Sequence, residues 1–186
     1  MLVFGHTGLT LGAAVLLKKI FKINFASKSA FLEAVRRVDL RLVMAASLLP
    51  DVVDKPIGIY LFGGTIGNGR IYAHTLLFFL FLVLLSIILY RRFKSTWAAA
   101  TAFGVFTHLI FDGMWRDPQT LFWPLQGWSF ARYDVTRWFE NNLNGLLTNP
   151  ADYVPELAGA AVLIWFALSL LRRKCFWRFI KSGVEC

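Results

Sequence analysis

Two long apolar stretches, residues 71–90 and 153–171, constrain the fold of this chain most strongly. A helix of about 20 apolar residues crosses the hydrocarbon core of a bilayer. Three shorter apolar segments cover residues 2–17, 40–50 and 96–115. Because backbone polar groups in lipid must be satisfied within the structure, each segment is expected to be helical. The sequence therefore predicts an all-α fold: a polytopic membrane helical bundle with about five membrane segments, one or two of them short.

The composition favours a single integral membrane domain over residues 1–186. Hydrophobic residues make up 57% of the chain, more than a soluble domain of this length would expose. The formal net charge of +9 also raises the question of nucleic acid. However, the basic residues cluster in loops beside apolar runs, which is typical of membrane topology and not of a phosphate-binding groove. We expect the bilayer as a partner and no nucleic acid, and nothing in the sequence indicates an oligomeric state.

Lysine and arginine are divided unequally between the connections. Fifteen of the 20 fall within residues 18–41, 91–94 and 172–181, which share one side if all five segments cross. The other side keeps Lys55, Arg70, Arg116, Arg132 and Arg137. Short loops rich in lysine and arginine stay in the cytoplasm. We therefore expect a prokaryotic-type plasma membrane protein with its N-terminus outside and residues 172–186 as a basic cytoplasmic tail.

The connection over residues 116–152 is rich in aromatic side chains, among them Trp123, Trp128 and Trp138. Tryptophan and tyrosine favour the headgroup layer of a bilayer. We expect this segment to be an interfacial loop along the outer leaflet. Residues 134–147 place several apolar side chains near one face and are expected to form a surface helix there.

The three histidines of the chain, His6, His74 and His108, all fall at the outer ends of the expected helices. So do Asp51, Asp54 and Asp112, which come from distant parts of the sequence. Ionisable groups at membrane depth are costly, so they usually mark a functional site. Histidine with aspartate is also a common ligand set for a metal ion. The expected topology therefore predicts a metal site near the outer face.

Two pairs of these residues have helical spacing. His108 and Asp112 are one turn apart on the same face, where both could bind one metal or the aspartate could orient the histidine. Asp51 and Asp54 follow Pro50 at the expected end of a helix that starts near Ser29. Two carboxylates there suit one divalent cation or bridge two. The alternatives are a buried structural pair and an ordinary solvated helix end.

Arg70 precedes His74 by four residues. An arginine beside a metal is suited to hold a phosphate oxygen, and the alternative is an anchor for a lipid headgroup. His6 is the weakest candidate when taken alone, because a single histidine near a chain terminus usually has no special role. The coincidence of all these groups at one depth favours a shared site.

Four motifs occur in order along the chain: Gly5-His6-Thr7, Ser47-Leu48-Leu49-Pro50-Asp51, Arg70 with Ala73-His74-Thr75-Leu76-Leu77-Phe78, and Thr107-His108-Leu109-Ile110-Phe111-Asp112. Together they resemble the YdjM-like family of predicted membrane-bound metal-dependent hydrolases, over roughly residues 5–125. The family is thought to be related to zinc-dependent phospholipase C and single-strand nucleases, so the resemblance implies phosphoester chemistry at a metal centre. Val53 and Gly69 stand where that family usually has an aspartate and a histidine. Either Asp54 substitutes, or the site holds fewer metal ions, or the activity is lost.

The resulting expectation is a metal-dependent hydrolase that cleaves a phosphoester of a membrane lipid at the outer face. Arg70 and Arg116 would neutralise charge on the phosphate, and Asp54 or Asp117 would be the general base. Zinc is favoured as the metal, with manganese and iron as alternatives. The alternative function is a non-enzymatic membrane protein that binds or transports metal, or a scaffold. The expected ligands of one or two ions are His6, Asp51, Asp54, His74, His108 and Asp112.

Overall fold

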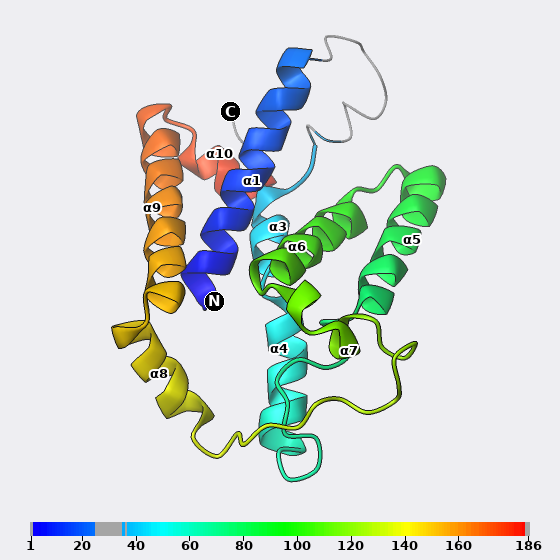
Figure 1. Ribbon diagram of the computed structural model, residues 1–186. Coiled ribbons are helices and arrows are strands. Elements are labelled where there is room, and N and C mark those ends of the chain that lie inside the picture. Colours follow the sequence, from blue (N-terminus) through cyan, green and yellow to red (C-terminus); the bar gives the residue numbers. More distant parts are fainter. Residues whose placement is uncertain (1, 25–34, 36, 185–186) are drawn as a thin grey trace.

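The computed structural model describes residues 2–24, 35 and 37–184, and all the regular elements in these ranges are helices. In chain order they are α1 (Val3–Asn24), α3 (Leu40–Ala46), α4 (Leu49–Lys55), the π-helix η1 (Pro56–Leu61), α5 (Leu76–Phe93), α6 (Trp97–Phe111), the 3₁₀-helix η2 (Met114–Arg116), α7 (Pro118–Leu121), α8 (Trp138–Thr148), α9 (Pro150–Arg172) and α10 (Phe176–Ser182). The predicted all-α fold is confirmed for this part of the chain (Figure 1).

Two helices in the described ranges are long and apolar enough to cross a membrane, namely α5 and α9. In α5 only 6% of the apolar window is buried, so most of its side chains are free to face lipid. Helix α6 is apolar but shorter. Helix α1 has the length but is not one of these two, and its sequence contains His6, Lys18, Lys19 and Lys22. The structure therefore supports two spans, and the expected number of about five is not confirmed.

The segment 40–50 differs from its prediction as the end of one continuous helix. Helix α3 stops at Ala46, and α4 begins at Leu49 with Pro50 in its first turn. Proline suits this position because its missing N–H would have no partner inside the helix. Asp51 accordingly lies in a first turn, where the helix dipole favours a carboxylate, and not at a C-terminal end as predicted. The expected start near Ser29 lies outside the described residues.

Helices α1 and α9 pack side by side (Figure 1). This contact fixes the position of the first turn of α1. A Cβ added to Gly8 would lie only 2.0 Å from the Gly159 carbonyl oxygen, so the two backbones touch at these glycines. The buried carboxylate of Glu156 accepts hydrogen bonds from the amides of Leu2 (2.6 Å) and Phe4 (2.9 Å). These bonds satisfy amides that a helix start otherwise leaves without partners, and they fix the turn that carries His6.

The basic C-terminal segment is folded onto the bundle. Phe179 of α10 packs edge-on against Phe166 of α9, with ring centroids 5.2 Å apart. The amide of Leu40 donates to the Gly183 carbonyl at 2.8 Å, which joins this segment to the start of α3. Asp39 caps α3 by accepting from two backbone amides. Its hydrogen bond with the Arg41 guanidinium holds the pKa of Asp39 below its ordinary value, against a smaller opposing effect of burial.

The aromatic segment between α7 and α9 closes over one end of the bundle. Helix α8 confirms the predicted surface helix approximately, and none of its residues is buried. Tyr72 packs edge-on against Trp123 and Phe130, so this segment lies against the turn that precedes α5. The Tyr133 amide also donates to the Gly67 carbonyl at 2.8 Å. Residues between Trp123 and Tyr133 are therefore in contact with residues between Gly67 and Tyr72.

Candidate metal centre

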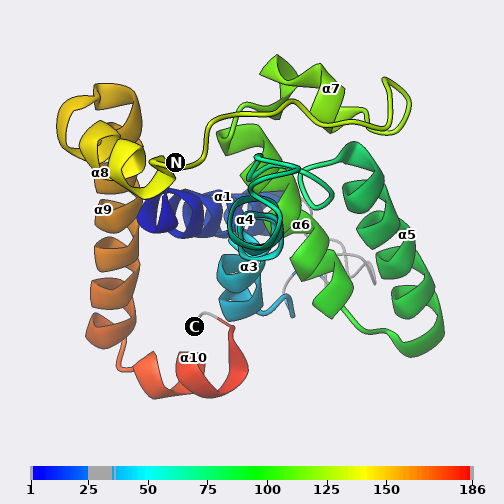
Figure 2. The same ribbon diagram turned by 90° about the horizontal axis from the view of Figure 1, so that it is seen from below.

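One ligand atom from each of Asp51, His74, His108 and Asp112 lies within 4.8 Å of the others. Asp51 comes from α4, His74 from the turn before α5, and the last two from the end of α6. Figure 2 looks along α4, with α1 and α6 on either side of it. These four residues, here called the His/Asp group, could hold a metal ion. The convergence predicted from the sequence is present in the fold.

His74 is oriented by the buried carboxylate of Asp54. Its Nδ1 lies 2.7 Å from Asp54 Oδ2, and the same carboxylate accepts from the backbone amides of Ile71, Ala73 and His74 at 2.9–3.2 Å. Asp54 is therefore occupied by the 71–74 turn and lies beside the His/Asp group, outside its four members. A carboxylate acceptor places the proton on Nδ1 and leaves the Nε2 lone pair for a metal.

His108 is oriented in the same way by a backbone carbonyl. Its Nδ1 lies 2.6 Å from the carbonyl oxygen of Ser47, which can only accept, so Nδ1 carries the proton. Gly104, one turn earlier in α6, makes this contact possible. A Cβ at Gly104 would lie 2.7 Å from Ala46 Cβ and 2.8 Å from the Ser47 amide nitrogen. The sequence signal for this close approach is a glycine four residues before a histidine, and it was not part of the prediction above.

The Nε2 atoms of His74 and His108 lie 3.1 Å apart. Both histidines direct their Nδ1 protons outward, so in the neutral rings two lone pairs face each other. Asp51 Oδ1 lies 3.6 and 3.8 Å from these nitrogens, and Asp112 Oδ2 lies 3.9 and 3.8 Å from them. Ligands of a tetrahedral zinc ion with Zn–N bonds of about 2.05 Å are roughly 3.3 Å apart. The donor set and its spacing therefore fit a divalent ion.

Two cations flank the carboxylates of the group. Lys55 Nζ lies 2.6 Å from Asp51 Oδ2, and Arg70 contacts Asp112 Oδ2 through Nε at 3.0 Å and an NH2 nitrogen at 2.9 Å. Burial alone would raise the pKa of Asp51, but His74 and Lys55 outweigh it and hold that pKa well below its ordinary value. Asp51 therefore faces the group as an anion.

His6 lies against the group without being one of its four members. Its buried ring stacks on His108, with centroids 4.0 Å apart. His6 Nε2 is 3.1 Å from Asp112 Oδ1, but the direction of this contact does not meet hydrogen-bond geometry. Among the described residues, neither ring nitrogen of His6 has a hydrogen-bond partner. His6 thus lies against Asp112 and His108, beside the His/Asp group.

A cavity of about 440 Å³ opens beside the His/Asp group. Arg70, Asp112 and Asp117 line it, and Lys55 lies opposite Trp138 of α8. Asp117 also caps α7 by accepting from the Thr120 amide. Arg70 contacts Asp112 of the group, whereas Asp117 lines the cavity without a contact to the four members. Arg116 lies in η2 and does not line this cavity.

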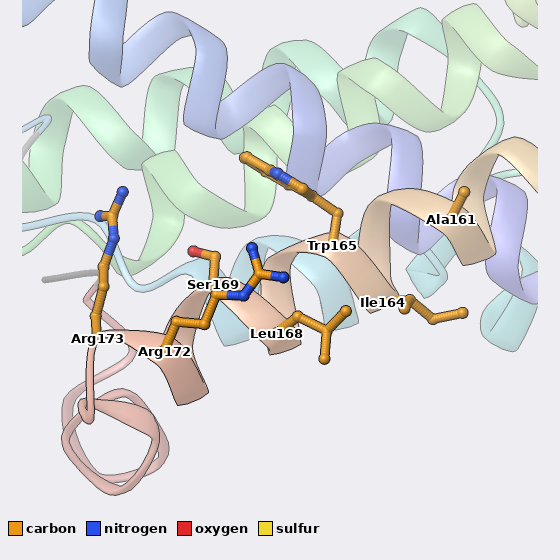
Figure 3. Close-up of a pocket in the computed structure, with 7 residues that line it drawn as sticks. All are labelled: Ala161, Ile164, Trp165, Leu168, Ser169, Arg172 and Arg173. Atoms are coloured by element: carbon orange, nitrogen blue, oxygen red, sulfur yellow. The ribbon is translucent and has the colours of Figure 1, made fainter.

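A second hollow, of about 550 Å³, runs along α9 and is lined by residues between Ala161 and Arg173 (Figure 3). Trp165 and Leu168 form its apolar part, and Arg172 and Arg173 lie at one end. None of the predicted ligands lines it. It is therefore separate from the cavity at the His/Asp group.

The fold and the site define an all-helical protein with membrane-type apolar helices and a buried His/Asp group suited to a metal ion. A family model described as YdjM inner membrane protein matches residues 1–181. The chain therefore belongs to the YdjM inner membrane protein family, as the motifs had indicated. The comparisons with curated proteins and with solved structures found no match.

Proposed function

We propose that this protein is a membrane-embedded metal-dependent hydrolase that cleaves a phosphoester of a lipid at the extracytoplasmic face. The observation that carries the proposal is the pair of facing Nε2 atoms, 3.1 Å apart, with a carboxylate oxygen of Asp51 from α4 and one of Asp112 from the end of α6 beside them. Each Nδ1 is held by an oxygen that is not itself a ligand. Preorganised ligands with outer hydrogen-bond partners are typical of functional metal sites.

Asp51, His74, His108 and Asp112 would hold the ion. Imidazole and carboxylate donors suit zinc first, with manganese and iron as alternatives. A divalent ion there would supply hydroxide near neutral pH and draw charge from a phosphoryl oxygen. Four ligand atoms gathered around one point favour a single ion, and His6 beside Asp112 leaves room for a second as the alternative.

The side chains around the cavity provide for an anionic substrate. Arg70 holds Asp112 through one edge of its guanidinium, and 44% of its side chain is exposed. That exposed part would bind a phosphate oxygen of the substrate. Asp117 lines the same cavity, whereas Asp54 is fully occupied by the 71–74 turn. We therefore favour Asp117 over Asp54 as the group that accepts a proton. The substrate would be the headgroup of a lipid seated by the aromatic segment.

If all five apolar segments cross the membrane, the distribution of basic residues supports an orientation with the N-terminus outside and the C-terminal segment in the cytoplasm. In this orientation the His/Asp group lies near the outer face. Exposed aromatic side chains such as Trp128 and Tyr133 would then meet the outer headgroup layer.

The test is the metal content of the full-length protein purified in detergent, measured by plasma mass spectrometry. Asp51→Ala, His74→Ala and His108→Ala should each lose the metal that the wild type retains. Asp152→Asn, which changes a cavity carboxylate outside the His/Asp group, should keep it. A screen of phospholipids in mixed micelles then measures release of phosphate-bearing products.

The outcomes separate the alternatives. Metal with lipid hydrolysis supports the proposal. Metal without hydrolysis of any lipid favours a metal-binding or transport protein. No metal in the folded wild type, even after metal is added back, overturns the metal centre and leaves a structural polar cluster.

A further inference from the structure

Lys55 joins a ligand carboxylate to the surface helix α8. It lies one helical turn after Asp51 in α4, on the same face. Its Nζ is 2.6 Å from Asp51 Oδ2 and 5.3 Å from the centre of the Trp138 ring. The side chains of Asp51 and Lys55 are only 13% and 23% exposed. A lysine held on both sides in this way is more fixed than a lysine in an exposed pair.

The two oxygens of Asp51 consequently have different surroundings. Oδ2 accepts the short hydrogen bond from Lys55. Oδ1 is buried, has no hydrogen-bond partner among the described residues, and faces the Nε2 atoms of His74 and His108. A carboxylate with both oxygens available can bind one ion through both, or bridge two ions. Because the ammonium of Lys55 occupies Oδ2, only Oδ1 of Asp51 is available to an ion.

We propose that Lys55 is a positioning residue of the metal centre: it engages Asp51 Oδ2, so that Asp51 binds a single ion through Oδ1 alone. The proposal rests on the metal centre of the proposed function and concerns how the ion is held. Lys55 fixes a low coordination number, which keeps room at the ion for substrate. Trp138 holds the ammonium against the carboxylate, so the position of α8 contributes to the ligand geometry.

The same chain offers a matched control. Lys94 Nζ also lies 5.3 Å from an aromatic ring centre, that of Tyr90. Lys94 is not within reach of the His/Asp group, since it follows the opposite end of α5. A change from lysine to methionine at position 94 therefore removes an equivalent contact without touching a ligand. Methionine keeps an unbranched apolar side chain of similar length.

The experiment loads full-length protein in detergent with Co²⁺ and records its visible absorption during titration. Four-coordinate Co²⁺ absorbs much more strongly than five- or six-coordinate Co²⁺, so the spectrum reports how Asp51 binds. In Lys55→Met we expect weaker absorption because Asp51 can bind through both oxygens. Outer partners of metal ligands typically contribute 10–100-fold to affinity, so we also expect Co²⁺ affinity to change by about tenfold or more. Lys55→Arg keeps a positive charge beside Asp51 and should show the wild-type spectrum.

Trp138→Leu supplies a second route that leaves both charges in place. It should change the spectrum in the same direction as Lys55→Met and by less. Lys94→Met should match the wild type. Identical spectra and affinities in wild type, Lys55→Met and Trp138→Leu overturn the role of Lys55 while the metal centre stands. Failure of the folded wild type to bind Co²⁺ overturns the metal centre and this proposal together.

Discussion

His74 and His108 direct their Nε2 atoms at each other across 3.1 Å, while their Nδ1 atoms lie against Asp54 and the Ser47 carbonyl on opposite sides. The geometry of the pair is thus set by groups outside it. Two neutral imidazoles in this arrangement repel each other unless a cation or a proton lies between them. Substitutions of the groups around the histidines therefore test the site, as do substitutions of the ligands.

Asp54→Asn should weaken metal binding although Asp54 is not one of the four ligands. Asparagine has one acceptor oxygen, whereas Asp54 accepts from three amides and from His74 with two. The change loosens the His74 ring and the 71–74 turn together. We expect metal affinity to fall by roughly 10–100-fold, measured by competition with a chelator of known affinity.

Asp117→Asn is the control for this experiment. Asp117 lines the cavity but does not contact His74 or His108, so its removal should leave metal affinity unchanged. Equal affinity in wild type and Asp54→Asn would show that Asp54 does not orient the ligand.

Gly104→Ala should disturb the site from behind the ligands. The new Cβ would meet Ala46 and the Ser47 amide at under 3 Å, so α6 and the α3–α4 junction must separate. Overpacking of this kind typically costs about 1–3 kcal/mol in the free energy of unfolding. The same displacement lengthens the His108–Ser47 hydrogen bond. We therefore expect both a lower midpoint of thermal unfolding in detergent and weaker metal binding.

The matched change is Gly64→Ala, because a Cβ at Gly64 has nothing within 4 Å. This variant should match the wild type in both measurements. Parallel behaviour of Gly104→Ala and Gly64→Ala would contradict the close approach of α6 to α3.

Arg70→Lys should separate metal binding from turnover. Lysine keeps the positive charge beside Asp112 but not the flat guanidinium that contacts it through two nitrogens and exposes its other edge to the cavity. If Arg70 binds the substrate phosphate, kcat/KM for the lipid should fall by roughly tenfold or more while metal content is retained. Loss of metal with unchanged turnover per bound ion would instead assign Arg70 to the ligands alone.

Asp39→Asn should destabilise the fold in a pH-dependent manner. Asparagine can still cap α3, so the change isolates the ion pair with Arg41. Because the pKa of Asp39 is lowered in the folded state, its charge stabilises the protein above the unfolded pKa of about 3.9. That contribution disappears as the pH falls through the folded pKa. Unfolding midpoints should therefore differ at pH 7 and converge at low pH.

The comparison variant is Asp39→Ala, which loses the cap as well as the charge. It should lower the free energy of unfolding by about 1 kcal/mol more than Asp39→Asn does, at every pH. A difference between wild type and Asp39→Asn that persists unchanged into acid would contradict the role of the ion pair.

The sequence predicted the convergence of the ligands better than it predicted their surroundings. The spacing of His108 and Asp112 and the shared depth of the histidines were enough to predict that four groups lie close together. The role of Asp54 was not predictable, because its partners lie 17 to 20 residues away in a turn with no periodic pattern. The ion pair of Arg70 with Asp112 was not predictable for the same reason, because the two residues are 42 positions apart in the sequence.

The break between α3 and α4 was missed for a different reason. The apolar run up to Pro50 predicts a helix end there, although proline is equally suited to the first turn of a new helix. That choice decides whether Asp51 meets a favourable or an unfavourable helix dipole. The expected number of spans is not confirmed, because apolar runs of intermediate length in a sequence do not show which of them cross a membrane and which pack inside the fold.

The contact of Glu156 with the amides of Leu2 and Phe4 joins the start of α1 to α9 across sequence separations of 154 and 152 residues. During synthesis the four members of the His/Asp group are all present once residue 112 has left the ribosome. The turn that carries His6 is fastened only after α9 has followed, some 150 residues behind it. A chain that stops before α9 would thus retain every member of the group but lack the Glu156 contacts that fix the turn carrying His6. Helix α9 thus supplies, through Glu156, the contacts that complete the surroundings of the centre.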